Sequence, residues 1–254
     1  MYNPTNFHKL IQSHSVLLVN KKEHSIATGI FIKYNELYFV LTVAHILIDT
    51  ALENILINFG IPGQEYPVKK AQYWKDDYLD LAFMKLNSFE AEIFQYKIQP
   101  FIIHNKLLGD FSTRLLKCAI SGYPISLAYK KNSNKIIGET FLITTPLSLL
   151  PERWPKAIIE NGKNPKDNFL LKYGHKHARE ILYSNEERKT LIDPKGLSGS
   201  GIWIFDPNSE NDEQPKYVLF GIQTGFYESS QLLAGTKVDL LFKQIESEYG
   251  EIIN

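Results

Sequence analysis

The sequence predicts a mostly β fold, built as two small antiparallel barrels and finished by a C-terminal helix. Most apolar segments of the 254-residue chain are short, rich in β-branched and aromatic residues, and bounded by turn formers. A break near residue 130, between "CAISGYP" and the loop "AYKKNSNK", divides the chain into halves with similar numbers of these segments. Only the last segment, "TKVDLLFKQIESEYG", spaces its apolar residues as a helix does.

The expected elements follow from these segments in chain order. We expect one domain over 1–254, with a first barrel at about 10–115, a second at about 116–235 and a helix at about 236–250. The segment 147–190 is more polar and interrupted by prolines, so we interpret it as long loops or an insertion with some helix. Strands are expected at 15–20, 27–34, 37–43, 55–59, 66–74, 79–86, 115–121, 136–145, 168–173, 201–205 and 217–224.

Charge and cysteine content narrow the class of protein. Lysine and arginine total 28, as do aspartate and glutamate, and both signs are scattered along the chain. We therefore expect no nucleic-acid or membrane partner, since both need a concentrated positive field. The single cysteine, Cys118, cannot pair within the chain, which excludes a disulfide-stapled secreted scaffold. With no secretory signal in "MYNPTNFHKLIQSH" and no apolar run of membrane-spanning length, a cytoplasmic location is expected.

The stretch "DPKGLSGSGIW" (193–203) gathers three glycines and two serines within six residues before an apolar run. Glycines this close together indicate a sharp turn or a close approach of the backbone. If Ser198 is a nucleophile, it needs an imidazole base, a carboxylate that orients the base, and backbone N–H groups aimed at the oxyanion. Gly196 and Ser198 are the candidates for these N–H donors.

The order of residues along the chain tests the possible partners of Ser198. The last histidine is His177, so no imidazole follows the serine, and the order serine, acid, histidine of α/β-hydrolases is excluded. The order acid, histidine, serine of subtilisin-like enzymes is disfavoured, because the first aspartate, Asp49, comes after His45, and His104 lies in none of the usual context. The remaining order is histidine, aspartate, serine.

His45 and Asp80 are the candidates for that remaining order. His45 stands at the end of the apolar strand in "YFVLTVAHIL", where a rigid sheet can fix a side chain that still faces a cleft. Asp80 opens "LDLAFMKL", where a carboxylate beside a buried strand can receive the imidazole N–H. Asp76 and Asp77 compete with Asp80, and their ordinary role is that of solvated loop charges.

These motifs resemble those of the trypsin-like serine peptidases. "LTVAHIL" is similar to the histidine motif of that family, "LDLAFMKL" to its aspartate motif and "GLSGSGIW" to its serine motif. The motifs are most similar to those of the single-domain bacterial members of the family, which are related to the Deg-type proteases. The resemblance covers nearly the whole chain outside 147–190 and implies two six-stranded antiparallel barrels with the triad between them. It implies that His45 is the general base, Asp80 its orienting acid and Ser198 the nucleophile, with the Gly196 and Ser198 amides as the oxyanion hole.

The resemblance also carries expectations about activation and specificity. Leu197 stands where trypsin-type zymogens have an aspartate that pairs with the newly cut N-terminus, so activation by propeptide removal is not expected. Thr224 falls where the family places a residue whose backbone carbonyl contacts substrate. Ile192, Phe226 and Leu233 fall at the positions of the primary pocket, and the lack of an acid among them favours a small or apolar substrate residue.

Two other groups could carry chemistry, and each also has an ordinary structural interpretation. His175 and His177 in "HKH" alternate as the residues of one strand face do, but no further Cys, His or Asp constellation surrounds them, so no metal is expected. Cys118 with the downstream histidines imitates the order of a thiol protease, yet "LLKCAISGY" is typical of a buried strand.

The sequence therefore predicts a serine endopeptidase that cleaves a protein or peptide substrate through an acyl-enzyme and needs no cofactor. Without a zymogen switch, we expect narrow specificity or gating by a regulatory partner protein, with control residing in 147–190. The habits of the family suggest a role in bacterial stress or antiphage defence. The alternative is a non-catalytic pseudo-protease that holds a peptide in the cleft between the barrels.

Overall fold

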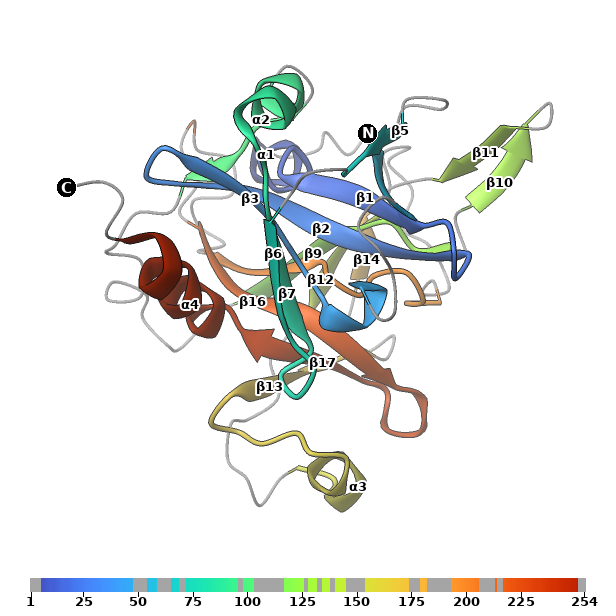
Figure 1. Ribbon diagram of the computed structural model, residues 1–254. Helices are drawn as coiled ribbons and strands as arrows, with labels where there is room; N and C mark the ends of the chain where they lie inside the picture. Colours follow the sequence, from blue (N-terminus) through green and yellow to red (C-terminus); the bar gives the residue numbers. More distant parts are fainter. Residues whose placement is uncertain are drawn as a thin grey trace.

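The computed structural model describes residues 6–47, 54–58, 65–68, 72–95, 98–102, 117–125, 128–131, 134–137, 140–144, 154–173, 179–181, 193–205, 213 and 217–250. These residues form two curled β-sheets, a small separate hairpin and a C-terminal helix (Figure 1). The predicted mostly β fold with two β halves and a terminal helix is confirmed.

The first sheet has eight strands instead of the six that were predicted for its barrel. Its hydrogen-bonded order is β5-β4-β1-β2-β3-β7-β6, and β8 pairs in parallel with β2. The strands are β1 (Ser15–Asn20), β2 (Ser25–Tyr34), β3 (Leu37–Thr42), β4 (Ile55–Asn58), β5 (Glu65–Pro67), β6 (Gln72–Asp76), β7 (Leu81–Lys85) and β8 (Phe101–Ile102).

The second sheet has seven strands in the order β13-β17-β16-β15-β9-β12-β14. Its strands are β9 (Lys117–Gly122), β12 (Thr140–Thr144), β13 (Asn168–Lys172), β14 (Arg179–Ile181), β15 (Gly201–Phe205), β16 (Tyr217–Tyr227) and β17 (Leu232–Lys237). The separate hairpin consists of β10 (Ala128–Lys131) and β11 (Asn134–Ile137).

The two sheets share one strand order. When the main strands of each half are numbered along the chain (β1, β2, β3, β4, β6, β7 and β9, β12, β13, β15, β16, β17), both sheets follow the ring 1-2-3-6-5-4. The hydrogen-bonded path of the first sheet opens between strands 5 and 4, and that of the second opens between strands 2 and 3. The extra strands β5 and β14 extend the sheet at these two openings. Each half therefore repeats the same module with a different seam.

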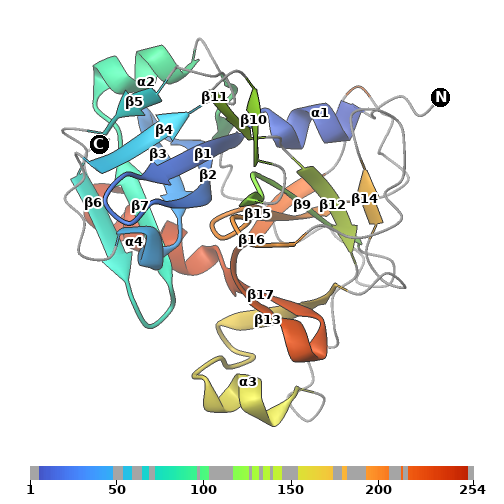
Figure 2. The same cartoon turned by 90° about the vertical axis from the view of Figure 1, so that its right-hand side faces the viewer.

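The helices at the two ends of the chain pack on opposite halves. Phe7 of α1 (Asn6–Gln12) stacks on Phe205 of the second sheet, with ring centroids 4.3 Å apart. Tyr249 of α4 (Asp239–Tyr249) packs against Phe39 and Phe83 of the first sheet, with centroids 5.6 and 6.3 Å away. In Figure 2, α1 lies beside the second sheet and α4 lies behind β6 and β7. The ends of the chain therefore tie the two halves together.

One hydrophobic core continues through both sheets. It runs from buried residues of the first sheet, such as Phe31 and Val40, to Ala119 and Trp203 of the second and to Leu241 of α4. Aromatic rings carry much of this packing, which supplies the main favourable contribution to folding. Among the helices that the structure describes, none combines the length and the apolar character required to cross a membrane.

Several elements differ from the sequence prediction. The predicted strand 66–74 is two short strands, β5 and β6. Helices α1, α2 (Ser88–Gln95) and α3 (Lys156–Glu160) were not predicted at these positions, although some helix was expected in 147–190. A capping box starts α2, because the N–H of Glu90 donates to the Asn87 side chain and the N–H of Asn87 donates to Glu90. The spacing "NSFE" was the signal for this helix.

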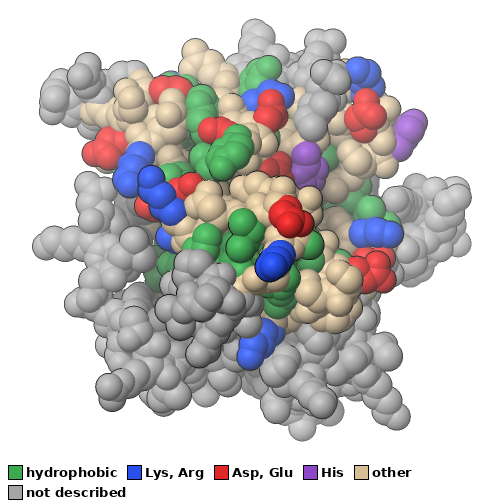
Figure 3. All heavy atoms as spheres, turned by 90° about the horizontal axis from the view of Figure 1, so that it is seen from below, with side chains coloured by type: hydrophobic (Ala, Val, Ile, Leu, Met, Phe, Trp, Pro, Cys, Tyr) green, Lys and Arg blue, Asp and Glu red, His purple; other side chains and the backbone are tan. Residues whose placement is uncertain are grey.

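The charged side chains are mixed on the face seen in Figure 3. Among the side chains drawn in colour there, Lys and Arg lie next to Asp and Glu and do not gather into a field of one sign.

His14 is a buried, neutral histidine between α1 and β1. Its Nδ1–H donates to the C=O of Gln99 (2.8 Å), and its Nε2 accepts from the hydroxyl of Tyr217 (3.2 Å). Burial lowers the pKa of His14 to about 4, although the hydrogen bond to Gln99 acts in the opposite direction. Burial likewise raises the pKa of Tyr217 to about 12, so the phenol stays a donor.

This burial predicts acid sensitivity between pH 6.5 and 4. In that window the unfolded chain binds a proton at His14 and the folded chain does not, so stability is lost as the pH falls. The contribution is on the order of 3 kcal/mol at most, from about 1.4 kcal/mol per pKa unit. In urea unfolding at pH 7.5 and 4.5, His14→Gln is expected to show a smaller pH dependence than the wild type. A variant of the exposed His24, His24→Asn, serves as the control, and an unchanged dependence in His14→Gln would contradict the assignment.

Candidate active site

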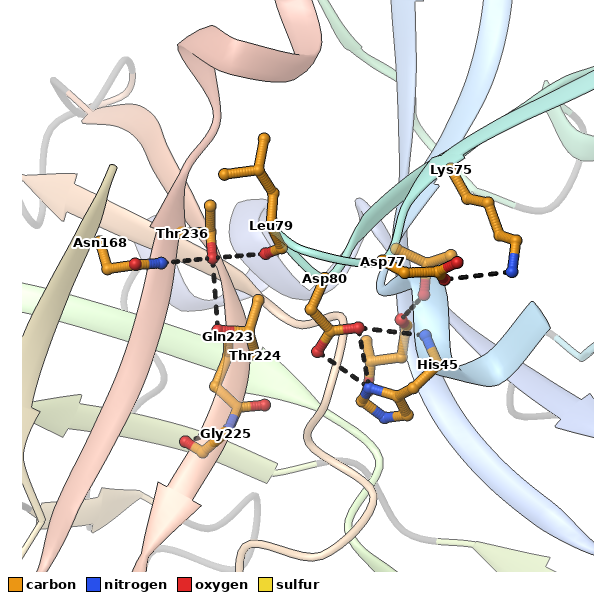
Figure 4. A network of polar contacts seen from close by, with 12 residues as sticks. His45, Lys75, Asp77, Leu79, Asp80, Asn168, Gln223, Thr224, Gly225 and Thr236 are labelled. Atoms are coloured by element: carbon orange, nitrogen blue, oxygen red, sulfur yellow. Dashed lines mark hydrogen bonds and ion pairs between the residues drawn. The ribbon is translucent and has the colours of Figure 1, made fainter. Parts of the chain in front are cut away.

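His45 is held at the end of a buried strand. Strand β3 ends at Thr42, and the 3₁₀ turn η1 (Ala44–Leu47) carries the histidine. The Nδ1–H of His45 donates to the Asp80 carboxylate, at 2.9 Å from Oδ2 and 3.0 Å from Oδ1, and the backbone N–H of His45 donates to Oδ1 at 3.0 Å (Figure 4). Because a carboxylate only accepts, the ring proton sits on Nδ1 and Nε2 is free to accept another. The imidazole is 44% exposed, so substrate can reach it.

Asp80 holds its position through an uncommon backbone conformation. Its φ is +54°, in the left-handed region that aspartate tolerates better than most residues. Its side chain is only 17% exposed, which strengthens its hydrogen bonds to His45. The competing acids have other partners, since Asp76 accepts from the N–H of Leu79 and Asp77 pairs with Lys75. Of the three acids, only Asp80 contacts His45 in the structure.

A lysine from the segment around α3 lies within electrostatic range of this pair. Lys163 follows Gly162 just after α3 and is partly buried. Burial lowers the pKa of its amine, and the negative charge of Asp80 acts in the opposite direction. Part of the predicted insertion 147–190 therefore approaches the candidate site.

The loop before Ser198 forms a tight turn with glycine at its third residue. The N–H of Leu197 donates to the C=O of Pro194 (3.0 Å), and Gly196 has φ +92°. These features are those of a type II turn, which requires positive φ at this position. A Cβ on Gly196 would lie 2.7 Å from the carbonyl oxygen of Tyr123, so only glycine fits.

The orientation of the peptide between Lys195 and Gly196 is fixed from outside the turn. The N–H of Ile125 donates to the C=O of Lys195 at 2.7 Å. Because the C=O and N–H of a trans peptide point in opposite directions, the N–H of Gly196 points away from Ile125. A backbone hydrogen bond thus sets the direction of one predicted oxyanion donor.

Two amides in this loop stand out because they have no acceptor. The N–H groups of Leu197, Gly199 and Ser200 donate to Pro194, Gln223 and Leu197, respectively. In the described part of the chain, the N–H groups of Gly196 and Ser198 donate to no protein acceptor. Buried amides are nearly always paired, so two free ones on alternate residues favour an oxygen ligand. They are the two donors that the sequence predicted.

Ser198 itself is half-buried and makes no hydrogen bond to the imidazole among the described residues. Its C=O accepts from the N–H of Thr28 (2.7 Å). Within the described residues, no hydrogen bond joins its Oγ to His45. Hydrogen bonds between catalytic groups are often longer without substrate and tighten when it binds. The structure therefore brings His45 and Asp80 together and leaves the link to Ser198 unmade.

The predicted substrate residues are placed differently from one another. Thr224 is 7% exposed, and its Oγ1 lies 3.4 Å from Thr236 Oγ1. Phe226 is half-buried and packs edge-on against Tyr173, with centroids 5.1 Å apart. Leu233 is completely buried in a hydrophobic cluster, so it is not accessible to substrate in this structure, contrary to the prediction. Ile192 lies outside the described residues.

Cys118 and the histidines of "HKH" are the other groups that the sequence singled out. Cys118 is buried, and burial raises its pKa to about 12, so the thiol stays protonated and unreactive. His175 and His177 lie outside the described residues. In the ranges that the structure describes, no three His, Cys, Asp or Glu side chains are arranged to hold a metal ion.

Sequence reasoning missed the residues that support the loops. Ile125 acts through its backbone N–H, which leaves no signal in residue type. Thr28 and Thr236 contact the loops of Ser198 and Asp80 through their hydroxyls. A threonine in "ATG" or "AGTK" is common in strands, so its spacing alone gives no warning.

Comparisons with known proteins identify the fold alone. No protein-family model matches the chain, and no curated protein matches it in sequence. The scabies mite inactivated protease paralogue S-D1 is similar in structure, with a TM-score of 0.58, 15% identity and 94% of each chain covered. The scabies mite inactivated protease paralogue S-I1 has a TM-score of 0.55 at 14% identity, covering 97% of this chain and 98% of that one.

A third solved structure is more distant. An inactive mutant form of Rv3671c from M. tuberculosis H37Rv gives a TM-score of 0.49 at 12% identity, with 98% of this chain and 93% of that chain covered. The two closer matches extend over nearly all of both chains, with two β halves and a C-terminal helix in this one. The chain has the two-barrel fold of the trypsin-like serine proteases.

Proposed function

We propose that the protein is a serine endopeptidase that cleaves a protein substrate through an acyl-enzyme. The observation that carries the proposal is the pair of unpaired amides, Gly196 and Ser198, in a loop whose other amides are bonded. One of them belongs to Ser198 itself, a half-buried serine in the loop before β15, and the His45–Asp80 pair supplies a base with a free Nε2. Each feature alone is ordinary, but together they are the parts that acyl transfer needs.

The proposed reaction follows from these groups. Ser198 Oγ attacks the substrate carbonyl while His45 Nε2 takes its proton, and Asp80 stabilises the resulting imidazolium. The carbonyl oxygen becomes an oxyanion that receives the N–H groups of Gly196 and Ser198. The C–N bond then breaks as His45 returns the proton to the leaving amine. Water, activated by His45, attacks the acyl-enzyme and releases the acid.

The proposal needs no ion pair to order the oxyanion turn, which is the type II turn at 194–197 that carries the Gly196 N–H. Leu197 is completely buried, and one of its methyl groups lies 3.1 Å from where a Cβ on Gly122 would be. Apolar packing and the Ile125 hydrogen bond hold the type II turn that a charge pair would otherwise have to stabilise. This supports a protease that is made in its final form.

The finer parts of the proposal concern substrate and control. Thr224 and the half-buried Phe226 carry no charge, which supports a preference for a small or apolar substrate residue. We extend the proposal to a cytoplasmic protease with narrow specificity, gated by a partner protein in bacterial stress or antiphage defence. The proximity of Lys163 to Asp80 supports a regulatory role for the segment around α3.

A non-catalytic peptide-binding module is the competing proposal. It is favoured by the missing hydrogen bond between Ser198 and His45, whereas the proposal of an enzyme requires this bond to form when substrate binds. The two proposals differ in whether Ser198 reacts.

Covalent labelling separates the enzyme from the binding module. A fluorophosphonate probe is expected to modify Ser198 in the wild type, as identified by peptide mass spectrometry, and Ser198→Ala is expected to abolish the adduct. Ser200→Ala is the matched control, because this neighbouring hydroxyl is buried and has no hydrogen-bond partner among the described residues. An unlabelled wild type, when a known serine protease reacts alongside, would favour the binding module.

Replacing the orienting acid tests the assignment of Asp80. Asp80→Asn is expected to lower the labelling rate by about four orders of magnitude, because the imidazole loses its correct tautomer. Asp76→Asn and Asp77→Asn are the controls, since Asp76 accepts a hydrogen bond from the N–H of Leu79 and Asp77 makes an exposed ion pair with Lys75. A larger effect from either control than from Asp80→Asn would show that the orienting acid was assigned wrongly.

A further inference from the structure

Thr28, on β2 of the first sheet, holds the Ser198 loop of the second sheet. Its backbone N–H donates to the C=O of Ser198 (2.7 Å), and its hydroxyl donates to the C=O of Gly196 (3.3 Å). The same hydroxyl accepts from the N–H of Tyr123 (3.0 Å). One buried side chain therefore joins the oxyanion turn to the segment that orients it.

The space around this hydroxyl is shaped to fit it. Thr28 is completely buried, and a Cβ on Gly122 would lie 2.7 Å from Thr28 Oγ1 and 2.1 Å from Ser200 Oγ. Gly122 thus leaves room for the two hydroxyls. On the other side, the hydroxyl of Thr42 donates to the C=O of Thr28 (2.9 Å), and Thr42 lies three residues before His45 in the chain. Thr28 lies between the loop of the nucleophile and the strand that leads to the base.

Thr236, on β17 of the second sheet, holds the Asp80 loop of the first sheet. Its hydroxyl donates to the C=O of Leu79 (3.0 Å), the residue before Asp80, and accepts from the side-chain amide of Asn168 (2.9 Å). Figure 4 shows these contacts meeting at one hydroxyl beside the His45–Asp80 pair. Thr236 is completely buried. Its bond to Leu79 fixes the peptide plane that enters Asp80, whose φ of +54° needs support from its surroundings.

We propose that Thr28 and Thr236 are reciprocal positioning residues, each holding the catalytic loop of the opposite sheet through its hydroxyl. Thr28 sets the oxyanion turn and Thr236 sets the orientation of Asp80 toward His45. Neither residue touches substrate. The inference rests on the proposed function for its effect on catalysis, and the two contacts also have consequences that can be measured without catalysis.

The hydroxyls can be removed with little change in shape. Thr→Val deletes the hydroxyl and keeps the branched side chain, and Thr→Ser keeps the hydroxyl and deletes the methyl. If the hydroxyl positions the loop, Ser rescues the function that Val loses. If the residue only fills space, Val is tolerated and Ser is the more harmful change.

The variants at Thr28 are tested on the oxyanion turn. Thr28→Val is expected to slow fluorophosphonate labelling by about ten- to hundred-fold, the range expected for a displaced donor, and Thr28→Ser is expected to restore it. The Ile125 amide, which bonds to the C=O of Lys195, is expected to exchange hydrogen faster in Thr28→Val than in Thr28→Ser. Wild-type labelling and exchange in Thr28→Val would overturn this half of the proposal.

The variants at Thr236 are tested on the His45–Asp80 contact. A hydrogen-bonded imidazole N–H gives a downfield proton resonance in the NMR spectrum, whether the ring is neutral or protonated. The Nδ1 proton of His45 can therefore be followed by NMR. This resonance is expected to shift or broaden in Thr236→Val and to stay in place in Thr236→Ser and Thr28→Val. An unchanged resonance in Thr236→Val would overturn this half of the proposal.

These readouts separate the positioning role from the proposed function. If the wild type fails to react with the probe, the endopeptidase proposal fails, and amide exchange and the NMR resonance still decide the roles of the two threonines. If the wild type reacts and Ser198→Ala does not, labelling decides them as well. Thermal unfolding of all four variants identifies any that are not folded, and the exchange and NMR measurements are then read from the Ser variants against the wild type, where a changed signal contradicts the proposal.

Discussion

The hydrogen bond from the Thr28 N–H to the Ser198 C=O marks the constraint on which the candidate site depends: two sheets must dock in one register. His45 and Asp80 lie in loops of the first sheet, and Gly196 and Ser198 lie in the loop before β15 of the second. Neither half holds all the groups that the proposed reaction needs. The geometry needed for acyl transfer therefore exists only while the interface between the sheets is intact.

At this interface, segments from each half of the chain pack against the opposite half. The N-terminal helix α1 stacks Phe7 on Phe205 of the second sheet, and the C-terminal helix α4 packs Tyr249 on the first. The hydroxyls of Thr28 and Thr236 repeat this crossing at the site itself. Apolar contacts of the terminal helices stabilise the interface together with the shared core, and the buried hydroxyls add specific hydrogen bonds at the site.

The sequence was informative where side chains carry the chemistry. Chain order, together with the apolar strands beside them, pointed to His45 and Asp80, and the structure joins these two residues through both carboxylate oxygens. It could not show that Ile125 orients the oxyanion turn, because that role belongs to a backbone N–H. Leu233 was assigned to the substrate pocket through the family resemblance, which gives its position along the chain but not the packing around it, and the structure buries its side chain completely in a hydrophobic cluster.

The open seams of the two sheets also create strand edges, where unpaired backbone groups are available to another strand. In the described chain, the strands added at the seams are β5, three residues long and ending in Pro67, and β14, also three residues long. Short edge strands, and those with proline, offer few free backbone groups to a second molecule. Within the residues that the structure describes, the strand added at each seam therefore offers only a short edge for pairing, although the module opens at a different place in each half.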